Sequence, residues 1–570
     1  MRAQRSHLSG FKGWRDSTGW RVHIQETGSR TLNGGALSPR WRKWFRSTPF
    51  ATAHLWQDVG RPQLGQPSFN FNLTTGKNTN RTTQGITGRT LDALFWMFAG
   101  SGVQAVLQWL VLVVLARLLA PADFGLVSAA LVVVGLSENL ARLGVGPAVV
   151  QLPHIETRHL RTGFTLSVLF GLLLAGLIWL LSPGIAGFFR MKELTPILRA
   201  LGLVFPFSGA SVMAESLLQR ELQFRRLAGI QVVSYAVGYS VVGIGLAQLG
   251  FGAWALVGAN LAQRIVKSAI LLIVQPCPKL PQIERGAFKE LMYFGGGFTL
   301  ARISGDVAIQ GDNLIVGRWL GAEALGLYDR AYQLMLLPAT LLGQVLDSVL
   351  FPAMAKVQHE PERLATAYRR GVALIALLVL PMSAAIFVLA PELIHVLLGP
   401  AWKDAIVPFQ ILTVGMLFRT SYKMSDSLAR ATGAVYRRAW RQGIYAALVV
   451  GGAWVGQHWG TAGVAYGVLG AITVNFILMA QLSLSLTSMT WKSFVAVHFP
   501  AISLTAIVCT EVWVVSLLIR NVAMPAILLL SVAMIVAAIS LLVLVRLTPK
   551  FVLGQDGVWM LKTLNSLYST

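Results

Sequence analysis

The stretch LARLLAPADFGLVSAALVVVGL, residues 115–136, joins two long apolar runs through one short turn. Apolar runs of about 20 residues cross ~30 Å of hydrocarbon as helices, in which the backbone polar groups bond within the segment. More such runs follow along the chain. The pattern predicts an all-α polytopic membrane protein with about 14 transmembrane helices, expected near residues 92–118, 123–141, 162–182, 198–218, 227–249, 253–275, 291–317, 323–350, 370–391, 405–424, 440–457, 461–484, 497–519 and 524–545.

The composition excludes a soluble enzyme. Of the 570 residues, 54% are hydrophobic and 13% are charged, whereas about 25% are charged in an average soluble protein. The two cysteines, Cys277 and Cys509, lie far apart and cannot form a disulfide framework. The sequence shows no phosphate-binding loop, metal-spaced ligand set or catalytic triad. We therefore expect no cofactor, no metal and no enzymatic activity. Energy would come from an ion gradient, the membrane potential or downstream consumption of a product.

Basic residues predict the orientation in the membrane. The short loops expected on one side carry 21 lysines and arginines, and those on the other side carry 6. Because cytoplasmic loops are enriched in these residues, both termini are expected in the cytoplasm, with the chain in the cell (inner) membrane. Residues 1–88 are strongly basic and contain no spanning run. We expect them to form a disordered tail near anionic headgroups, and no motif in them indicates nucleic-acid binding.

An internal repeat predicts how the helices are grouped. RLLAPADFGL (117–126) aligns without gaps to RWLGAEALGL (318–327), with four of ten positions identical. Both stretches are turns between paired spans, and six spans separate them, so the two halves should point the same way and enclose a central cavity. We expect two parallel six-helix lobes plus a C-terminal helix pair. The expected domains are a tail (1–88), an N-terminal lobe (89–276), a cytoplasmic linker (277–290), a C-terminal lobe (291–485), and helices 13–14 with a cytoplasmic tail (486–570).

Two longer stretches carry a resemblance to a known family. LARLLAPADFGLVSAALVVVGLSENLARLGVGPAVVQ (115–151) and DNLIVGRWLGAEALGLYDRAYQLMLLPATLLGQVLDSVLFPAMAKVQ (312–358) resemble the polysaccharide exporter family. This family includes lipopolysaccharide and exopolysaccharide repeat-unit flippases and the colanic-acid and teichuronic-acid exporters. The resemblance extends from about residue 88 to about residue 500. Members of the family usually start just before the first span, which places the assigned start of this chain in question.

The resemblance implies a fold shared with the multidrug/oligosaccharidyl-lipid/polysaccharide transporters. The implied function is a flippase that moves undecaprenyl-pyrophosphate-linked oligosaccharide repeat units across the cytoplasmic membrane by alternating access between two lobes. Its product would serve O-antigen, exopolysaccharide or capsule synthesis. Membrane lipids, a polysaccharide polymerase and a chain-length regulator are candidate partners.

Three alternatives to this function stay open. They are a drug/cation antiporter or a peptidoglycan lipid II flippase of the same superfamily, and a membrane enzyme of envelope assembly. The short outer loops disfavour the enzyme. Seven bases within or at the ends of the spans favour an anionic substrate over a drug cation.

Polar residues of the seventh expected span are the first candidates for a site. Arg302, Asp306, Gln310 and Asn313 share one helical face, and Asp312 lies beside them. A cation at mid-membrane costs about 3 kcal/mol on insertion scales, so Arg302 is expected to face a wet cavity. Its planar fork suits pyrophosphate or an acidic sugar, with Asp306 as counter-ion or proton carrier. The alternative is an Arg302–Asp306 pair that serves packing alone.

Other charged residues in the spans complete the set. The further substrate-binding candidates are Arg264 and Lys267 in span 6 and Arg419 and Lys423 in span 10. Those of span 10 lie near the cytoplasmic end, where snorkelling to the headgroups is the alternative. Glu138, four residues before Arg142, is either a counter-ion at the site or a partner of that arginine. The ion-coupling or counter-ion candidates are Asp306, Asp312, Glu138, Glu215 and Asp347.

Overall fold

A computed structural model describes residues 86–142, 145–152, 155–276, 282–291, 310–521, 525–547 and 553–559 of the chain. All ordered elements among these residues are helices, and no strand occurs among them. Ten of the described helical stretches are long and apolar enough to cross a membrane, and one bent pair raises the number to eleven. This confirms the prediction of an all-α polytopic membrane protein.

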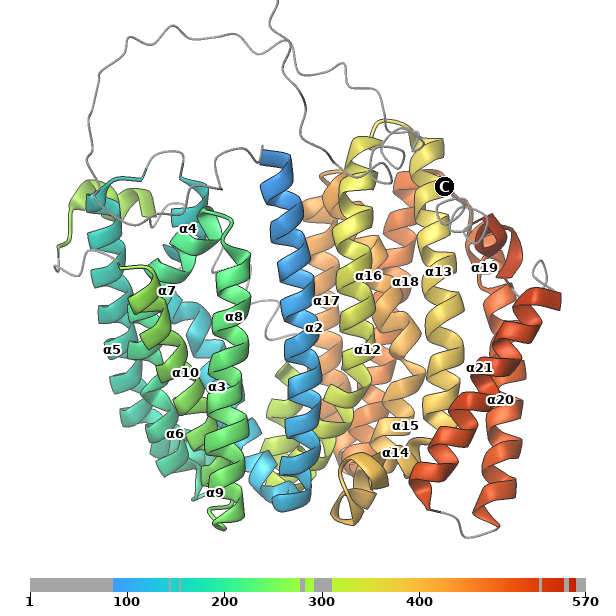
Figure 1. The fold of residues 1–570 in the computed structure, drawn as a ribbon, viewed down its shortest axis with the longest axis horizontal. Coiled ribbons are helices and arrows are strands. Elements are labelled where there is room, and N and C mark those ends of the chain that lie inside the picture. Colours follow the sequence, from blue (N-terminus) through green and yellow to red (C-terminus); the bar gives the residue numbers. More distant parts are fainter. Residues whose placement is uncertain are drawn as a thin grey trace, which may run out of the picture. The chain divides into compact units, whose positions relative to one another are not determined.

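The N-terminal half of the described chain contains the six spans predicted there, two of which are built from two or three consecutive helices (Figure 1). The fifth span changes from α-helix to π-helix in η1 and back again. The elements are α2 (Ile86–Leu118), α3 (Pro121–Arg142), α4 (Val145–Gln151), α5 (Thr157–Phe189), α6 (Leu194–Gly202), α7 (Val204–Arg220), α8 (Phe224–Tyr235), η1 (Ala236–Gly243), α9 (Ile244–Gln248) and α10 (Ala253–Val274).

The C-terminal half contains one bent span and one hairpin formed by two predicted spans. The tenth span bends by 42° between α15 and α16. The stretch 435–487 is a hairpin, because η3 turns α17 back onto α18. The elements are α12 (Gly321–Lys356), α13 (Pro361–Val388), α14 (Ala390–Leu397), η2 (Pro400–Ala405), α15 (Ile406–Val414), α16 (Met416–Ala431), α17 (Val435–Gly456), η3 (Gln457–Trp459), α18 (Gly460–Thr487), α19 (Trp491–Ala496), α20 (Phe499–Arg520) and α21 (Ala526–Leu547), with further helical residues at 285–291, 310–319 and 553–559.

Two expected spans differ from the others. Most of the seventh, 291–317, lies outside the described residues. The eighth falls in α12, which is helical over its whole length but is not among the ten apolar candidates. α12 carries the polar residues Asp329, Arg330 and Gln333 in its first half. The division of the chain into lobes at residues 277–290 stays a prediction.

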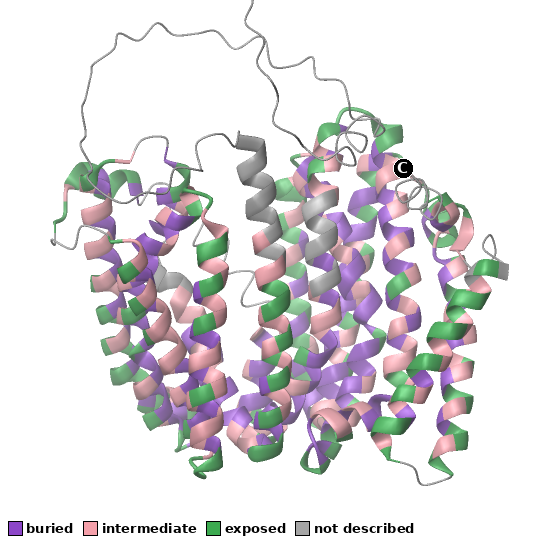
Figure 2. Cartoon of the chain, viewed as in Figure 1, coloured by how far each residue is buried: buried purple, intermediate pink, exposed green. Residues whose placement is uncertain are grey.

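The outward faces of the bundle are apolar. Only 11% of the apolar window in α21 and 17% of that in α2 is buried, so most of their aliphatic side chains lie on the surface (Figure 2). Exposed apolar surface on this scale needs a hydrocarbon surrounding. The α20–α21 pair packs on α13 and α14, where Arg520 bonds both carboxylate oxygens of Glu392 at 2.7 and 3.0 Å.

Candidate functional site

The two halves cross where the internal repeat falls, between α3 and α12. A Cβ atom on Gly125 would overlap the carbonyl oxygen of Ala322, and one on Gly326 would overlap that of Pro121. Gly125 and Gly326 are equivalent positions of the internal repeat, and so are Pro121 and Ala322. The two contacts are therefore equivalent, and the helices cross with pseudo-twofold symmetry. Glycine at both positions is what permits backbones to approach this closely.

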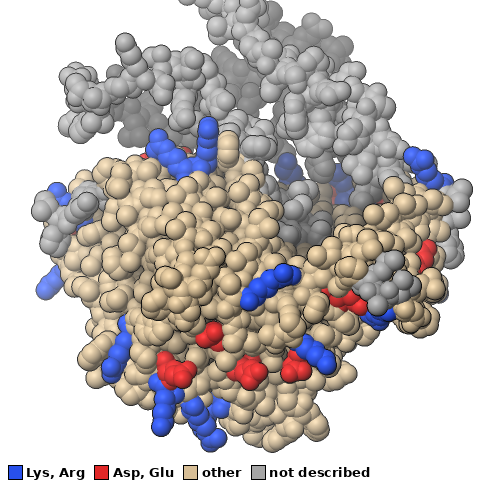
Figure 3. Space-filling view, turned by 60° about the horizontal axis from the view of Figure 1, so that its bottom comes forward, with Lys and Arg blue, Asp and Glu red and all other residues tan. Residues whose placement is uncertain are grey.

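A second set of contacts joins the halves beside this crossing. The indole Nε1 of the buried Trp402 donates to the carbonyl oxygen of Ala116 at 2.9 Å, and its ring meets Phe124 edge-on at 5.2 Å. Arg117 donates to the carbonyl oxygen of Val396 at 2.6 Å. Seen from this end of the protein (Figure 3), basic and acidic side chains both lie on the surface. The crossing and these contacts hold the halves together at the end that is predicted to be external.

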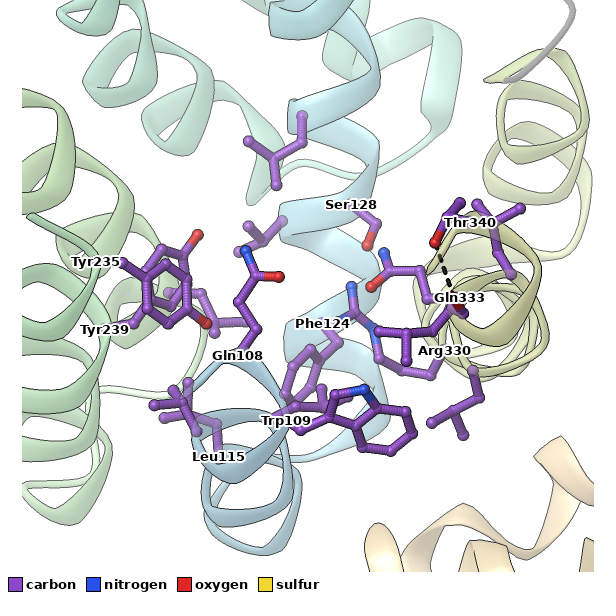
Figure 4. A pocket seen from close by; sticks show the side chains of 18 residues that line it. Gln108, Trp109, Leu115, Phe124, Ser128, Tyr235, Tyr239, Arg330, Gln333 and Thr340 are labelled. Carbon is purple, nitrogen blue, oxygen red and sulfur yellow. Dashed lines mark hydrogen bonds between the residues drawn. The ribbon is translucent and has the colours of Figure 1, made fainter. Parts of the chain in front are cut away.

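A cavity of about 400 Å³ lies next to the crossing, between α2, α3, the α8–η1 junction, α10 and α12. It contains contributions from both halves of the chain (Figure 4). This volume falls within the ~300–1,000 Å³ typical of small-molecule sites. Its polar and aromatic lining residues are Gln108, Trp109, Phe124, Ser128, Tyr235, Tyr239, Arg330, Gln333 and Thr340.

Asp329 organises the α12 wall of the cavity. Its carboxylate, which is buried, accepts hydrogen bonds from Arg330 Nη2 at 2.8 Å and Gln333 Nε2 at 3.0 Å. It also accepts from Ser128 Oγ at 2.6 Å and Asn313 Nδ2 at 3.4 Å. Ser128 and Asp329 are again repeat equivalents, so this bond crosses between the halves. The ion pair neutralises Arg330, the one cation among the described residues that line this cavity.

We expect Asp329→Asn to destabilise the protein. Removing one partner of a buried ion pair costs about 3–5 kcal/mol because the other charge stays buried without compensation. The double change Asp329→Asn with Arg330→Gln removes both charges and should recover most of this loss. Thermal unfolding of the purified protein in detergent measures both effects. Equal midpoints for wild type and Asp329→Asn would show that the pair contributes nothing.

The opposite wall is aromatic. Tyr235 and Tyr239 stack at 4.8 Å with their planes 11° apart, and Asn260 Nδ2 of α10 donates to the Tyr239 hydroxyl at 3.4 Å. Tyr235 is the last residue of α8, and Tyr239 lies within the π-helical segment η1 that follows. π-Helical segments occur frequently at functional sites, because they shift side chains relative to an α-helix.

The charged candidates of the N-terminal half form two ion pairs. Arg264 donates from Nη1 to Glu138 Oε1 at 2.9 Å and from Nη2 to Oε2 at 3.3 Å. Lys267 Nζ lies 2.8 Å from Glu215 Oε1. The four residues come from α3, α7 and α10, and each is partly exposed, between 15% and 27%. Glu138 thus meets the arginine of another span, and the side chain of Arg142 lies outside the described set.

The described candidates of the C-terminal half contact residues of the same half. Arg419 is buried and donates from Nη1 to the Tyr445 hydroxyl at 2.8 Å. Asp312 is also buried and accepts from the Tyr328 hydroxyl at 2.8 Å. The side chain of Lys423 packs against Gly343 of α12. Residues Arg302 and Asp306, and the side chain of Asp347, lie outside the part that the structure describes.

Several residues of the cavity were not singled out from sequence. Arg330 is one of the seven basic residues within or at the ends of the expected spans, and such a position is a sequence signal for a functional site. Asp329 lies close to the turn before α12, where an acidic residue gives no such signal. Tyr235, Tyr239 and Gln108 stand in apolar runs where nothing distinguishes a cavity face from a packed one. Only their convergence in space marks them.

Comparisons with known proteins place this geometry in context. The model of a family described as "Polysaccharide biosynthesis protein" matches residues 114–407. The chain is 25% identical over 297 residues to the teichuronic acid biosynthesis protein TuaB of Bacillus subtilis (strain 168), covering 51% of this chain and 60% of the relative. It is 24% identical over 402 residues to the lipopolysaccharide biosynthesis protein WzxC of Escherichia coli (strain K12), covering 68% and 80%. The chain thus spans about 60% of the length of the first of these relatives.

Solved structures show a similar fold. A lipid II flippase MurJ in an inward closed conformation superposes with a TM-score of 0.63 at 12% identity, over 80% of this chain and 98% of that one. An inward-facing multidrug resistance transporter of the MATE family gives 0.53 at 19% identity, over 67% and 95%. At such identities the likeness extends to the fold alone.

Proposed function

The chain belongs to the polysaccharide biosynthesis protein family, and from that membership we propose that it is a flippase for lipid-linked oligosaccharide repeat units. The substrate is an oligosaccharide on undecaprenyl pyrophosphate, moved from the cytoplasmic to the outer leaflet of the inner membrane. A polysaccharide polymerase and a chain-length regulator act on the product. The names of the relatives, teichuronic acid and lipopolysaccharide biosynthesis proteins, support this class of substrate.

The proposal depends on two ion pairs, Arg264–Glu138 and Lys267–Glu215, whose basic residues both lie on α10. Charged residues inside a membrane bundle are costly and commonly mark the path of a substrate or ion. Arg264 and Lys267 lie one turn apart on one helix and are partly exposed, so a ligand can reach both. A pyrophosphate presents oxygens to both at once, and arginine binds phosphate oxygens with two parallel bonds.

Glu138 and Glu215 complete the mechanism as counter-ions. In the empty site they neutralise the two bases, which lowers the cost of keeping these charges within the membrane. An incoming pyrophosphate competes for Arg264 and Lys267, and the displaced carboxylates then become available to a proton or a metal cation. This exchange would couple movement of the substrate to an ion gradient. Asp312 and Asp347 are the candidates for a similar role in the C-terminal half.

The crossing of α3 and α12 supports alternating access. It joins the halves at the end predicted to be external, beside a cavity to which both halves contribute. Transport would require the crossing to open while the opposite end closes. The shared contacts between repeat equivalents suit such an exchange, because a pseudo-twofold interface can separate without unfolding either half.

Deleting the gene tests the proposed activity. We expect the lipid-linked oligosaccharide of the producing cell to accumulate on the cytoplasmic leaflet, and the surface polysaccharide that contains the same repeat unit to disappear. Mass spectrometry of the lipid extract identifies the sugar. A drug/cation antiporter would leave this lipid at its normal level and change only drug resistance.

The orientation has its own test. A reporter fused after residue 225 or 437 should be cytoplasmic, and one fused after residue 250 or 458 should be external, because each pair flanks one predicted span. Alkaline phosphatase and green fluorescent protein fusions give opposite readouts at each position. The reverse pattern would mean that the α3–α12 crossing faces the cytoplasm.

A further inference from the structure

We infer that the cavity between Tyr235, Tyr239 and the Asp329–Arg330–Gln333 wall binds a sugar ring of the transported headgroup. This inference rests on the proposed function and adds a second subsite to it. The pyrophosphate is held by the bases on α10, and a pyranose near it is held by the cavity. Among the described residues that line this cavity, no charge other than that of the paired Arg330 occurs.

The chemistry of the lining fits a sugar better than it fits a phosphate. A pyranose has one apolar face of C–H groups and an equatorial edge of hydroxyls. The aromatic side chains Trp109, Tyr235 and Tyr239 offer flat surfaces for the first. The amide of Gln108 can donate and accept bonds with the second. Gln333 Nε2 donates to Asp329 and the Thr340 hydroxyl donates to the Leu337 carbonyl oxygen at 2.9 Å, so these two side chains offer their oxygens as acceptors. A phosphate would instead need unpaired cations.

Figure 4 shows how these groups are arranged. The tyrosine stack lies on one side, Arg330 and Gln333 lie on the other, and Gln108 extends between them from α2. Arg330 also packs its guanidinium over the Phe124 ring at 5.0 Å, which fixes the position of that wall. A ring that enters the cavity therefore meets an aromatic face and polar side chains at the same time.

Helix α10 connects the two subsites. Asn260 contacts the Tyr239 hydroxyl at the cavity, and Arg264 follows one turn later on the same helix. With a rise of 1.5 Å per residue, Arg264 lies about 6 Å and Lys267 about 10 Å along the axis from Asn260. A pyrophosphate bound at those bases leaves its first sugars within reach of the tyrosines.

Binding measurements with two lipids distinguish the sugar subsite from the pyrophosphate subsite. The full-length protein in nanodiscs is titrated with the lipid-linked repeat unit extracted from the deletion strain and with bare undecaprenyl pyrophosphate. We expect Tyr235→Ala and Tyr239→Ala to weaken binding of the first by about tenfold and to leave binding of the second unchanged. Arg264→Ala should weaken both. Tyr239→Phe keeps the aromatic face and should stay within about threefold of wild type.

The controls distinguish the possible failures. Tyr466 of α18 is 63% exposed, outside the cavity, and Tyr466→Ala deletes the same side chain without an expected effect on either lipid. Tyrosine variants that weaken both lipids equally, or neither, would overturn the sugar subsite and leave the proposed function intact. If wild type binds neither lipid, the proposed function itself is wrong.

Discussion

Export is expected to stop when Arg264 is replaced by alanine, at unchanged protein level in the membrane. Losing one partner of a close charge pair in a binding site costs about 2–5 kcal/mol, which corresponds to a 30-fold or greater loss of affinity. Arg264→Lys keeps the charge but not the planar fork, so it should retain a part of the activity. The amount of surface polysaccharide, with a blot for the protein, measures the effect.

A double change separates a binding role from a purely structural pair. If Arg264 only neutralises Glu138, then Arg264→Ala with Glu138→Ala should restore export, because neither charge is left alone. If Arg264 binds pyrophosphate, the double variant stays inactive. Arg520, which bonds Glu392 in the same bidentate way away from the cavity, provides the matched control. Arg520→Ala should cost stability and leave export largely intact.

A side chain larger than hydrogen at the α3–α12 crossing should also abolish export. Valine at Gly125 or Gly326 would overlap a backbone carbonyl of the facing helix, which cannot rotate away as a side chain can. Overpacking costs about 1–3 kcal/mol even where neighbours can adjust. We expect Gly125→Val and Gly326→Val to hold the halves apart at this end. The control is Gly187→Val on α5, which should export normally, because Gly187 is exposed and a Cβ atom there would meet no described atom within 4 Å.

The accessibility of residue 128 to a thiol reagent measures directly whether the two halves separate at the α3–α12 crossing. Its side chain is buried at the crossing. In a chain whose two native cysteines are replaced by serine, Ser128→Cys should react slowly with a membrane-impermeant maleimide added from outside. Adding Gly125→Val should make the reaction fast. Equal reaction rates, together with normal export, would show that the crossing is not a gate.

The presence and approximate positions of most spans were predictable because a bilayer imposes a one-dimensional signal. A span needs about 20 apolar residues whatever its neighbours are, so α5 or α13 can be located from composition alone. The internal repeat could also be recognised from the sequence, because the two aligned stretches have glycine at equivalent positions, Gly125 and Gly326. What the sequence did not show is that these two glycines face each other's helices, because alignment gives equivalence and not contact.

The ion-pair partners of the charged residues could be identified only from the three-dimensional structure. Glu138 has Arg142 four residues away in sequence, yet it bonds Arg264 of another span. Spacing on one helix reveals local pairs only. Tyr235 and Tyr239 were missed for a related reason, since a tyrosine in an apolar run has the same pattern in a core, at lipid and in a cavity. The π-helical segment that places them has no sequence signature.

The most direct test of the flippase is a leaflet assay with purified components. The protein is reconstituted in liposomes with the lipid-linked repeat unit, and an impermeant glycosidase or periodate is added outside. With wild-type protein, the sugar of both leaflets should be consumed over time, because inner-leaflet lipid is moved outward and exposed. With Arg264→Ala, only the sugar that faces outward at the start should react. If wild-type and protein-free liposomes lose the same share of sugar, the chain does not move this lipid, and the account is contradicted.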